Sequence, residues 1–250
     1  MYKTIKIESF AHFIELLEKD TQFDLANRLE GVTLYRGQNC DLPLLPKIER
    51  SNKTISEILD IEAILLNEFE KRCQPFLDFE IDNDWDLLAC AQHYGLPTRL
   101  LDWTENPLVA LWFAVSLGSQ DNSNSVVWIF DVENEDLVDD FGQNPLEIKN
   151  TLVFDPRHIN KRITSQSGWF TVHRITDSSK KMILPLEKNS AYRNGLVKLL
   201  IPHRMSGDFL NKLNKLGINQ ATVFADLDGL CKHLEWMFFC ERDEFIDRVK

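Results

Sequence analysis

The chain has 250 residues, of which 44% are hydrophobic and 27% are charged, and this is the composition of an ordinary globular protein. Its formal net charge is −11. That charge argues against general nucleic-acid binding and against binding to anionic membranes, because both depend on clustered Lys and Arg. The five cysteines form no CxxC pair, so we expect reduced thiols and no metal site. With no secretory signal and no long apolar run, the sequence predicts a cytoplasmic protein.

The first segment predicts a helix followed by a strand that ends in an unusual arginine. Apolar residues recur at helical spacing after Ser9, and this indicates an N-terminal helix over about residues 9–29 packed on the core. The strand at 32–37 ends with Tyr35, Arg36 and Gly37, and the glycine lets a backbone or a ligand approach closely. Arg36 is expected either to pair with a buried carboxylate such as Asp102 or to bind a ligand.

The chain from 84 to 117 contains two predicted helices joined by a polar link. Asp84 is expected to cap the first helix, and Gly95 ends it. The second helix has Asn106 as its N-cap and Pro107 in its first turn. Its body, 108–115, is apolar on every side, which is typical of a helix buried in the core.

Hydrogen-bonding side chains are dense around this link, beside the most apolar segment of the chain. Buried polar groups need partners, so they either satisfy one another or point at a ligand. A general-base pair of His93 and Asp102 is conceivable, but a histidine at a helix end more often caps carbonyls. The residues in question are Gln92, His93, Tyr94, Thr98, Arg99, Asp102, Trp103 and Thr104.

The remaining elements complete the predicted fold. A capping-box pattern at Thr54 and Glu57 begins a helix that runs to about 72. Strands are expected at 125–132, 152–154, 168–173 and 196–201, a helix at 209–216, a short extended segment at 221–224 and a final helix from Asp226. These elements predict an α+β fold with a central mixed or antiparallel sheet and flanking helices, in a single domain over 1–250.

Several of these motifs resemble the FRG domain family, which is named after an aromatic-Arg-Gly motif. They are Tyr35-Arg36-Gly37-Gln38, the block from Ala91 to Thr104, Gln166 before Phe170-Thr171, and Thr222-Val223-Phe224 followed by Asp226-Leu227-Asp228-Gly229. The resemblance extends from about Leu29 to Leu234. It implies a bacterial or phage cytosolic protein of the toxin or phage-defence type.

The order of motifs is also similar to that of arginine-class ADP-ribosyltransferases, and this implies NAD as a possible substrate. The similarity implies that Arg36 binds the pyrophosphate of NAD. It also implies that Tyr94 or Trp103 stacks on the nicotinamide or adenine ring, and that Thr104 hydrogen-bonds to a ribose. Gln166 stands where that family has a catalytic glutamate and supplies no negative charge. Either Asp102 or Asp226 then supplies the missing carboxylate, or the fold binds a nucleotide without transferring it.

Two classes of function therefore stay open. One is an enzyme, an NAD-dependent ADP-ribosyltransferase or NAD glycohydrolase, with Arg36, Gln166 and Asp102 as catalytic residues. The other is a non-catalytic module that binds a nucleotide or a protein partner through the same pocket. The predicted binding residues are Tyr35, Gly37, Gln92, His93, Tyr94, Thr98, Arg99, Trp103 and Thr104.

Overall fold

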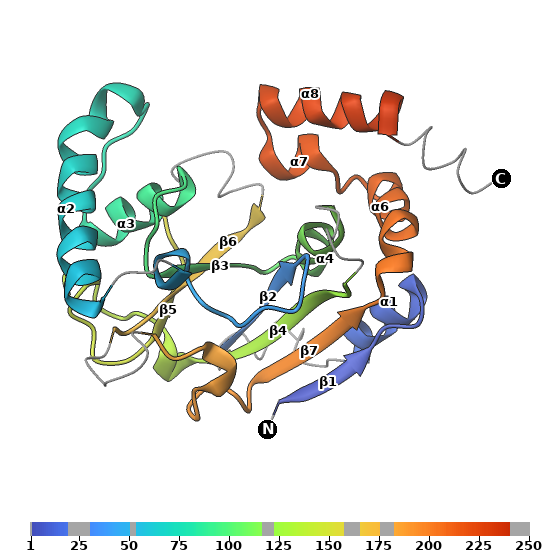
Figure 1. Cartoon of the computed structure of the whole chain (residues 1–250), viewed down its shortest axis with the longest axis horizontal. Helices are drawn as coiled ribbons and strands as arrows, with labels where there is room; N and C mark the ends of the chain where they lie inside the picture. Colours follow the sequence, from blue (N-terminus) through green and yellow to red (C-terminus); the bar gives the residue numbers. More distant parts are fainter. Residues whose placement is uncertain are drawn as a thin grey trace.

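A computed structural model describes residues 2–19, 31–50, 54–116, 123–157, 166–175 and 183–240. Within these residues, seven strands form one sheet in the order β1-β7-β4-β2-β3-β6-β5 (Figure 1). Strand β1 pairs with β7 in parallel, and the other neighbouring strands pair antiparallel. The predicted α+β class with a mixed sheet is confirmed. The strands are β1 (Lys3–Lys6), β2 (Gly31–Gln38), β3 (Leu100–Thr104), β4 (Ser125–Glu133), β5 (Leu152–Phe154), β6 (Gly168–Val172) and β7 (Leu196–Ile201).

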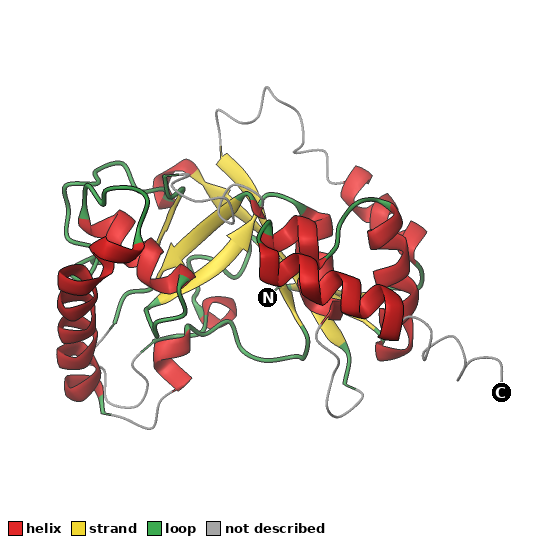
Figure 2. Ribbon diagram, turned by 90° about the horizontal axis from the view of Figure 1, so that it is seen from above, coloured by secondary structure: helices red, strands yellow, loops and turns green. Residues whose placement is uncertain are grey.

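Helices gather at both ends of this sheet (Figure 2). Helices α2 and α3 lie at the end formed by β6 and β5, and α1, α4 and α6–α8 lie toward the other end (Figure 1). No helix in the described part of the chain is long and apolar enough to cross a membrane. The α-helices are α1 (Phe10–Lys19), α2 (Ile55–Cys73), α3 (Asp84–His93), α4 (Pro107–Ser116), α6 (Ser206–Lys215), α7 (Gln220–Phe224) and α8 (Leu227–Glu235). Short helical turns include η3 (Lys47–Arg50) and the π-helical η8 (Trp236–Cys240).

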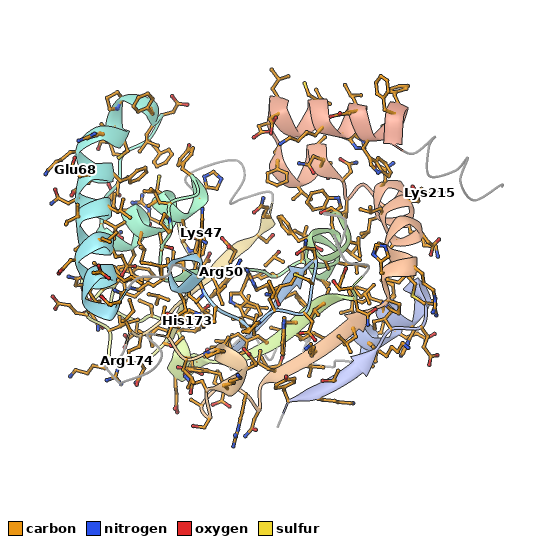
Figure 3. The ribbon with its side chains drawn as sticks, viewed as in Figure 1. Lys47, Arg50, Glu68, His173, Arg174 and Lys215 are labelled. Atoms are coloured by element: carbon orange, nitrogen blue, oxygen red, sulfur yellow. The ribbon has the colours of Figure 1, made fainter. Side chains whose placement is uncertain are left out.

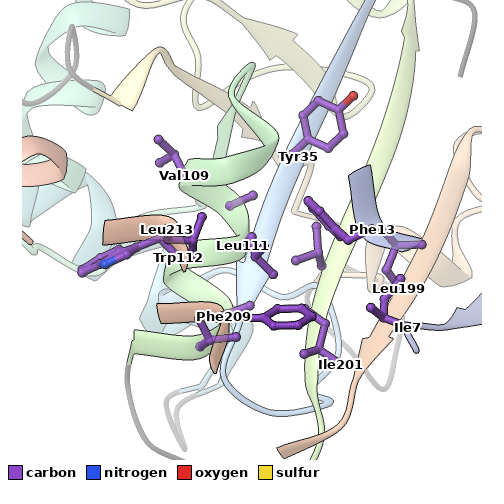
Figure 4. Packing of buried hydrophobic residues seen from close by; sticks show 14 of the residues in the cluster. Ile7, Phe13, Tyr35, Val109, Leu111, Trp112, Leu199, Ile201, Phe209 and Leu213 are labelled. Atoms are coloured by element: carbon purple, nitrogen blue, oxygen red, sulfur yellow. The ribbon is translucent and has the colours of Figure 1, made fainter. Parts of the chain in front are cut away.

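Strand β4 is apolar from Val126 to Phe130 because both faces of the sheet are covered there. Val127 and Ile129 belong to a cluster that α4, α1 and α6 complete on one face (Figure 4). Val126, Trp128 and Phe130 belong to a second cluster on the opposite face. The alternation follows from the two-residue period of a strand, whose successive side chains point to opposite faces.

The predicted helix ends are mostly confirmed. Asn106 Oδ1 accepts a hydrogen bond from Leu108 N at 3.0 Å, and Gly95 follows α3 with a φ of +88°. The prediction that Asp84 caps α3 is wrong, because the cap is Asn83, whose Oδ1 accepts from Asp86 N at 2.9 Å. Asp84 lies one residue further along, in the first turn of the helix.

Two elements differ from the sequence prediction. The polar link contains strand β3, which forms because residues 100–104 pair with β6 over five residues. Residues 220–224 form helix α7 rather than an extended segment. There, Asn219 and Thr222 make a reciprocal capping box, and this local pairing outweighs the strand preference of Val and Thr.

Helix α4 lies directly against β2 at Gly37. A Cβ atom added at this glycine would lie 1.9 Å from the carbonyl oxygen of Ala110 and 2.6 Å from the backbone nitrogen of Ala114. Glycine is therefore required by the close approach of the helix backbone. The same contact fixes the end of β2 where Arg36 lies.

Candidate functional site

Strands β2 and β3 separate next to Arg36. They share one register pair, Tyr35 with Thr104, whereas β2 and β4 pair over eight residues. The Arg36 guanidinium bridges this gap in the strand pairing, where Nη1 donates to the backbone oxygen of Asp102 at 2.5 Å. The same nitrogen lies 3.6 Å from Oδ2 of Asp102. The structure thus brings together Arg36 and the polar link, which are 66 residues apart along the chain.

The positive charge of Arg36 is poorly compensated. Its side chain is 16% exposed, and no hydrogen-bond partner of Nε is found among the described residues. Burial lowers the pKa of Arg36 and Arg50 lowers it further, while Asp102 acts in the opposite direction. An anion in the gap would favour the charged guanidinium, since it would offset both the burial and the repulsion from Arg50.

Asp102 is held by a short chain of polar side chains. Its carboxylate is 59% exposed and accepts from Gln92 Nε2 at 3.1 and 3.3 Å. Gln92 Oε1 in turn accepts from Thr98 Oγ1 at 2.7 Å, and Thr98 is buried. Gln92 and Thr98 are therefore positioned to orient Asp102, and their own polar atoms are satisfied within the chain.

Two further cations come from η3, which lies between α2 and β2 (Figure 3). Lys47 Nζ donates to the Gly95 carbonyl at 2.8 Å, and Arg50 Nη2 donates to the Leu45 carbonyl at 3.3 Å. No carboxylate among the described residues forms an ion pair with either side chain. Neither residue was predicted from the sequence, because both belong to a proline-containing loop whose position depends on the fold.

A buried polar row lies close to Arg36. Trp103 Nε1 donates to Thr171 Oγ1 at 3.1 Å, and Thr171 Oγ1 lies 3.1 Å from Nε2 of His173. Burial lowers the pKa of His173 to about 3, and repulsion from Arg36 and Arg99 adds to the effect. The imidazole is therefore neutral at physiological pH. Because Thr171 already accepts from Trp103, its hydroxyl proton is available to His173 Nε2.

Two residues predicted to bind a ligand are buried in the interior and contact other parts of the chain. Arg99 is 1% exposed and its Nε donates to both carboxylate oxygens of Glu62 at 3.0 Å, while Nη1 donates to the Leu146 carbonyl. Trp103 is 3% exposed and its ring packs on Phe130 with centroids 5.3 Å apart. In this structure both side chains support the site from within rather than line its surface.

Gln166 lies beside Thr104, and its side chain faces helix α7. The hydroxyl of Thr104 donates to the backbone oxygen of Gln166, and Gln166 Nε2 donates to the Val223 carbonyl at 3.2 Å. The side-chain amide brings no negative charge to this position. Asp102 is thus the carboxylate in contact with Arg36.

The remaining predicted residues divide between core and surface. Tyr35 is fully buried on the α4 face of the sheet, next to the glycine that admits α4. Tyr94 is 56% exposed, and its ring meets His93 edge-on at a centroid distance of 4.9 Å. Of the two rings proposed for stacking, Tyr94 is the accessible one.

The acidic pair after α7 has a structural role. Asp226 Oδ1 accepts from Gly229 N at 2.7 Å and caps α8, and Asp228 pairs with Lys232 at 2.7 Å. In the described ranges, no group of three or more His, Cys, Asp or Glu side chains is arranged to hold a metal ion.

Residues 32–123 match the model of the FRG domain family. This match agrees with the motifs seen in the sequence. The matched range includes Arg36, Lys47, Arg50 and the whole link from Gln92 to Thr104, but not Gln166. No curated protein and no solved structure matches the chain.

Proposed function

We propose that the gap between β2 and β3 binds the diphosphate of an NAD-like dinucleotide, in an FRG-domain protein of the toxin or defence type. The main support for this proposal is the incompletely compensated positive charge of Arg36. Its guanidinium is largely buried, its Nε has no partner among the described residues, and Arg50 repels it. A phosphate would accept the free N–H and offset the repulsion.

The surroundings of the gap suit a nucleotide. Lys47 and Arg50 add positive charge at one side without a carboxylate paired to either in the described structure. Tyr94 offers an exposed aromatic ring at the end of the same link. Phosphate recognition by Arg and Lys combined with stacking on an aromatic ring is a common way to hold a nucleotide.

In the enzymatic form of the proposal, Asp102 is the catalytic carboxylate. When the bond between ribose C1′ and the nicotinamide nitrogen breaks, its electron pair leaves with nicotinamide and positive charge develops on the ribose. The partly exposed Asp102 carboxylate stabilises that charge. Water, or an acceptor group, then bonds to C1′ and releases one proton. Thr104 holds the strand end, and the buried Trp103–Thr171–His173 row keeps the site rigid.

A second candidate is a non-catalytic module that binds a nucleotide or a protein partner. The position of Gln166 favours it, because its amide is engaged with the Val223 carbonyl and supplies no negative charge to the gap. In this form the nucleotide binds to Arg36 without turnover.

The test combines NAD binding, by isothermal titration calorimetry, with nicotinamide release, by chromatography. The enzymatic form predicts release by the wild type, loss of release in Asp102→Asn, and loss of both binding and release in Arg36→Gln. The non-catalytic form predicts binding lost in Arg36→Gln and no release from the wild type. Arg72→Gln, on the exposed face of α2, is the matched control. If wild-type protein does not bind NAD, the proposal is wrong in both forms.

A further inference from the structure

A second hollow lies away from the Arg36 gap, between helices α4, α6, α7 and the C-terminal α8–η8 segment. Its volume is about 160 Å³. It is lined by aromatic residues, by the aliphatic side chains of Leu210 and Ile218, and by several polar groups. The lining includes Trp112 and Ser116 of α4, Asn214 of α6, and Lys232, His233 and Trp236 of the C-terminal segment.

Three of the ten lining residues carry aromatic rings, namely Trp112, His233 and Trp236. Trp112 is 6% exposed, and its ring lies on the side of α4 away from β2 and β4 (Figure 4). It meets Phe224 edge-on at a centroid distance of 5.9 Å. The rings of His233 and Trp236 are nearly parallel, with an interplanar angle of 17° and centroids 6.0 Å apart. Rings arranged in this way favour a planar, aromatic occupant, by stacking or edge contacts.

The polar lining offers one buried hydroxyl without a partner in the described structure, and its lysine is paired, which favours a neutral occupant with a hydrogen-bonding group. Lys232 is already paired with Asp228 at 2.7 Å, so its charge is compensated. Asn214 Oδ1 accepts from Asn219 Nδ2 at 3.0 Å. Ser116 Oγ is buried and has no hydrogen-bond partner within the described ranges. A rotation of its hydroxyl about χ1 is a small change that would direct it at a polar atom in the hollow.

The volume sets the size of the occupant. A cavity of about 150 Å³ accommodates a single benzene ring, so this hollow is suited to one ring with a small substituent and is too small for a dinucleotide. We propose that it is a second ligand site, which takes a small, neutral, planar ring bearing an amide or carbonyl group. The hollow shares no lining residue with the Arg36 gap.

Benzamide is a suitable probe, titrated into the full-length chain and followed by protein-observed NMR or calorimetry. We expect saturable binding in the millimolar range. Cyclohexanecarboxamide, which has the amide but no flat ring, and benzoate, which is charged, should each bind about tenfold more weakly or not at all.

Variants locate the site and separate it from the Arg36 gap. Ser116→Val should weaken benzamide about tenfold through the lost hydrogen bond, and Trp236→Leu should weaken it through the lost ring contact. Circular dichroism shows whether each variant is folded, and Ser116→Ala serves if the valine disturbs α4. Arg36→Gln should bind benzamide as the wild type does. Absence of saturable binding, unchanged binding in both hollow variants, or loss of binding in Arg36→Gln would each overturn the proposal.

Discussion

Glu62→Gln tests the conclusion that Arg99 is a structural residue rather than a ligand contact. Glu62 and Arg99 are each 1% exposed, and they are joined through Nε and Nη2, with a further hydrogen bond from the backbone nitrogen of Arg99. The substitution keeps the volume of the side chain but removes its charge. It also turns one acceptor into an NH₂ group, which faces a guanidinium that can only donate.

The expected effect is large. Removing one partner of a buried ion pair leaves the other charge uncompensated and costs about 3–5 kcal/mol. Total stabilities of domains are about 5–15 kcal/mol, so Glu62→Gln should remain folded in water but unfold at much lower urea concentration. Urea denaturation followed by fluorescence gives the midpoint and the slope, and the slope should stay unchanged.

Glu68→Gln is the matched control, because Glu68 pairs with Arg72 on the exposed side of the same helix. Its unfolding midpoint should match that of the wild type within reproducibility. The double variant Glu62→Leu with Arg99→Met should regain much of the lost stability, since apolar residues can replace a buried pair. If Glu62→Gln unfolds at the same urea concentration as Glu68→Gln, the buried pair does not stabilise the fold as argued.

Three further predictions follow from the packing and from the pKa shifts. Gly37→Ala should lower the free energy of unfolding by about 3 kcal/mol or more, because its Cβ would overlap the α4 backbone; Gly142→Ala, where a Cβ meets only the Asp140 side chain, should leave it nearly unchanged, and equal urea midpoints would contradict this. The pKa of His173 falls to about 3 on folding. Its contribution to the free energy of unfolding is therefore full above about pH 6.5 and is lost by up to about 1.4 kcal/mol per pH unit as pH falls toward 3. His173→Gln should flatten that slope in urea titrations, and an unchanged slope would refute the burial of a neutral His173. Burial raises the pKa of Cys90 to about 11, so iodoacetamide at pH 8 should alkylate the exposed Cys231 first by mass spectrometry, and faster labelling of Cys90 would contradict its burial.

Local patterns predicted those features that local interactions decide. The Thr54 and Glu57 capping box, the Asn106 cap and the Gly95 stop all occur as predicted. They depend on hydrogen bonds within a few residues and on the φ values that glycine permits. The α4 segment was predicted as buried because it is apolar on every side, and six of its ten residues are buried.

Features that depend on distant partners were not predictable in the same way. Strand β1 was not predicted, because it is an edge strand that exists through its parallel pairing with β7. The partner of Arg99 lies 37 residues away on α2, and nothing near Arg99 identifies it. Arg50 comes close enough to Arg36 to lower its pKa, and it belongs to a loop whose path the fold determines. The polar residues of the link could be located in the sequence, but which of them are buried in the interior could not.

The central claim is that Arg36 binds phosphate in the gap between β2 and β3, and ADP-ribose binding tests it most directly. ADP-ribose carries the diphosphate but no nicotinamide, so turnover does not complicate the titration. We predict that the wild type and Arg72→Gln bind it with equal affinity and that Arg36→Gln binds at least about tenfold more weakly while remaining folded, as expected when a charged hydrogen bond is lost. Equal binding by wild type and Arg36→Gln, or no binding by either, would contradict the account.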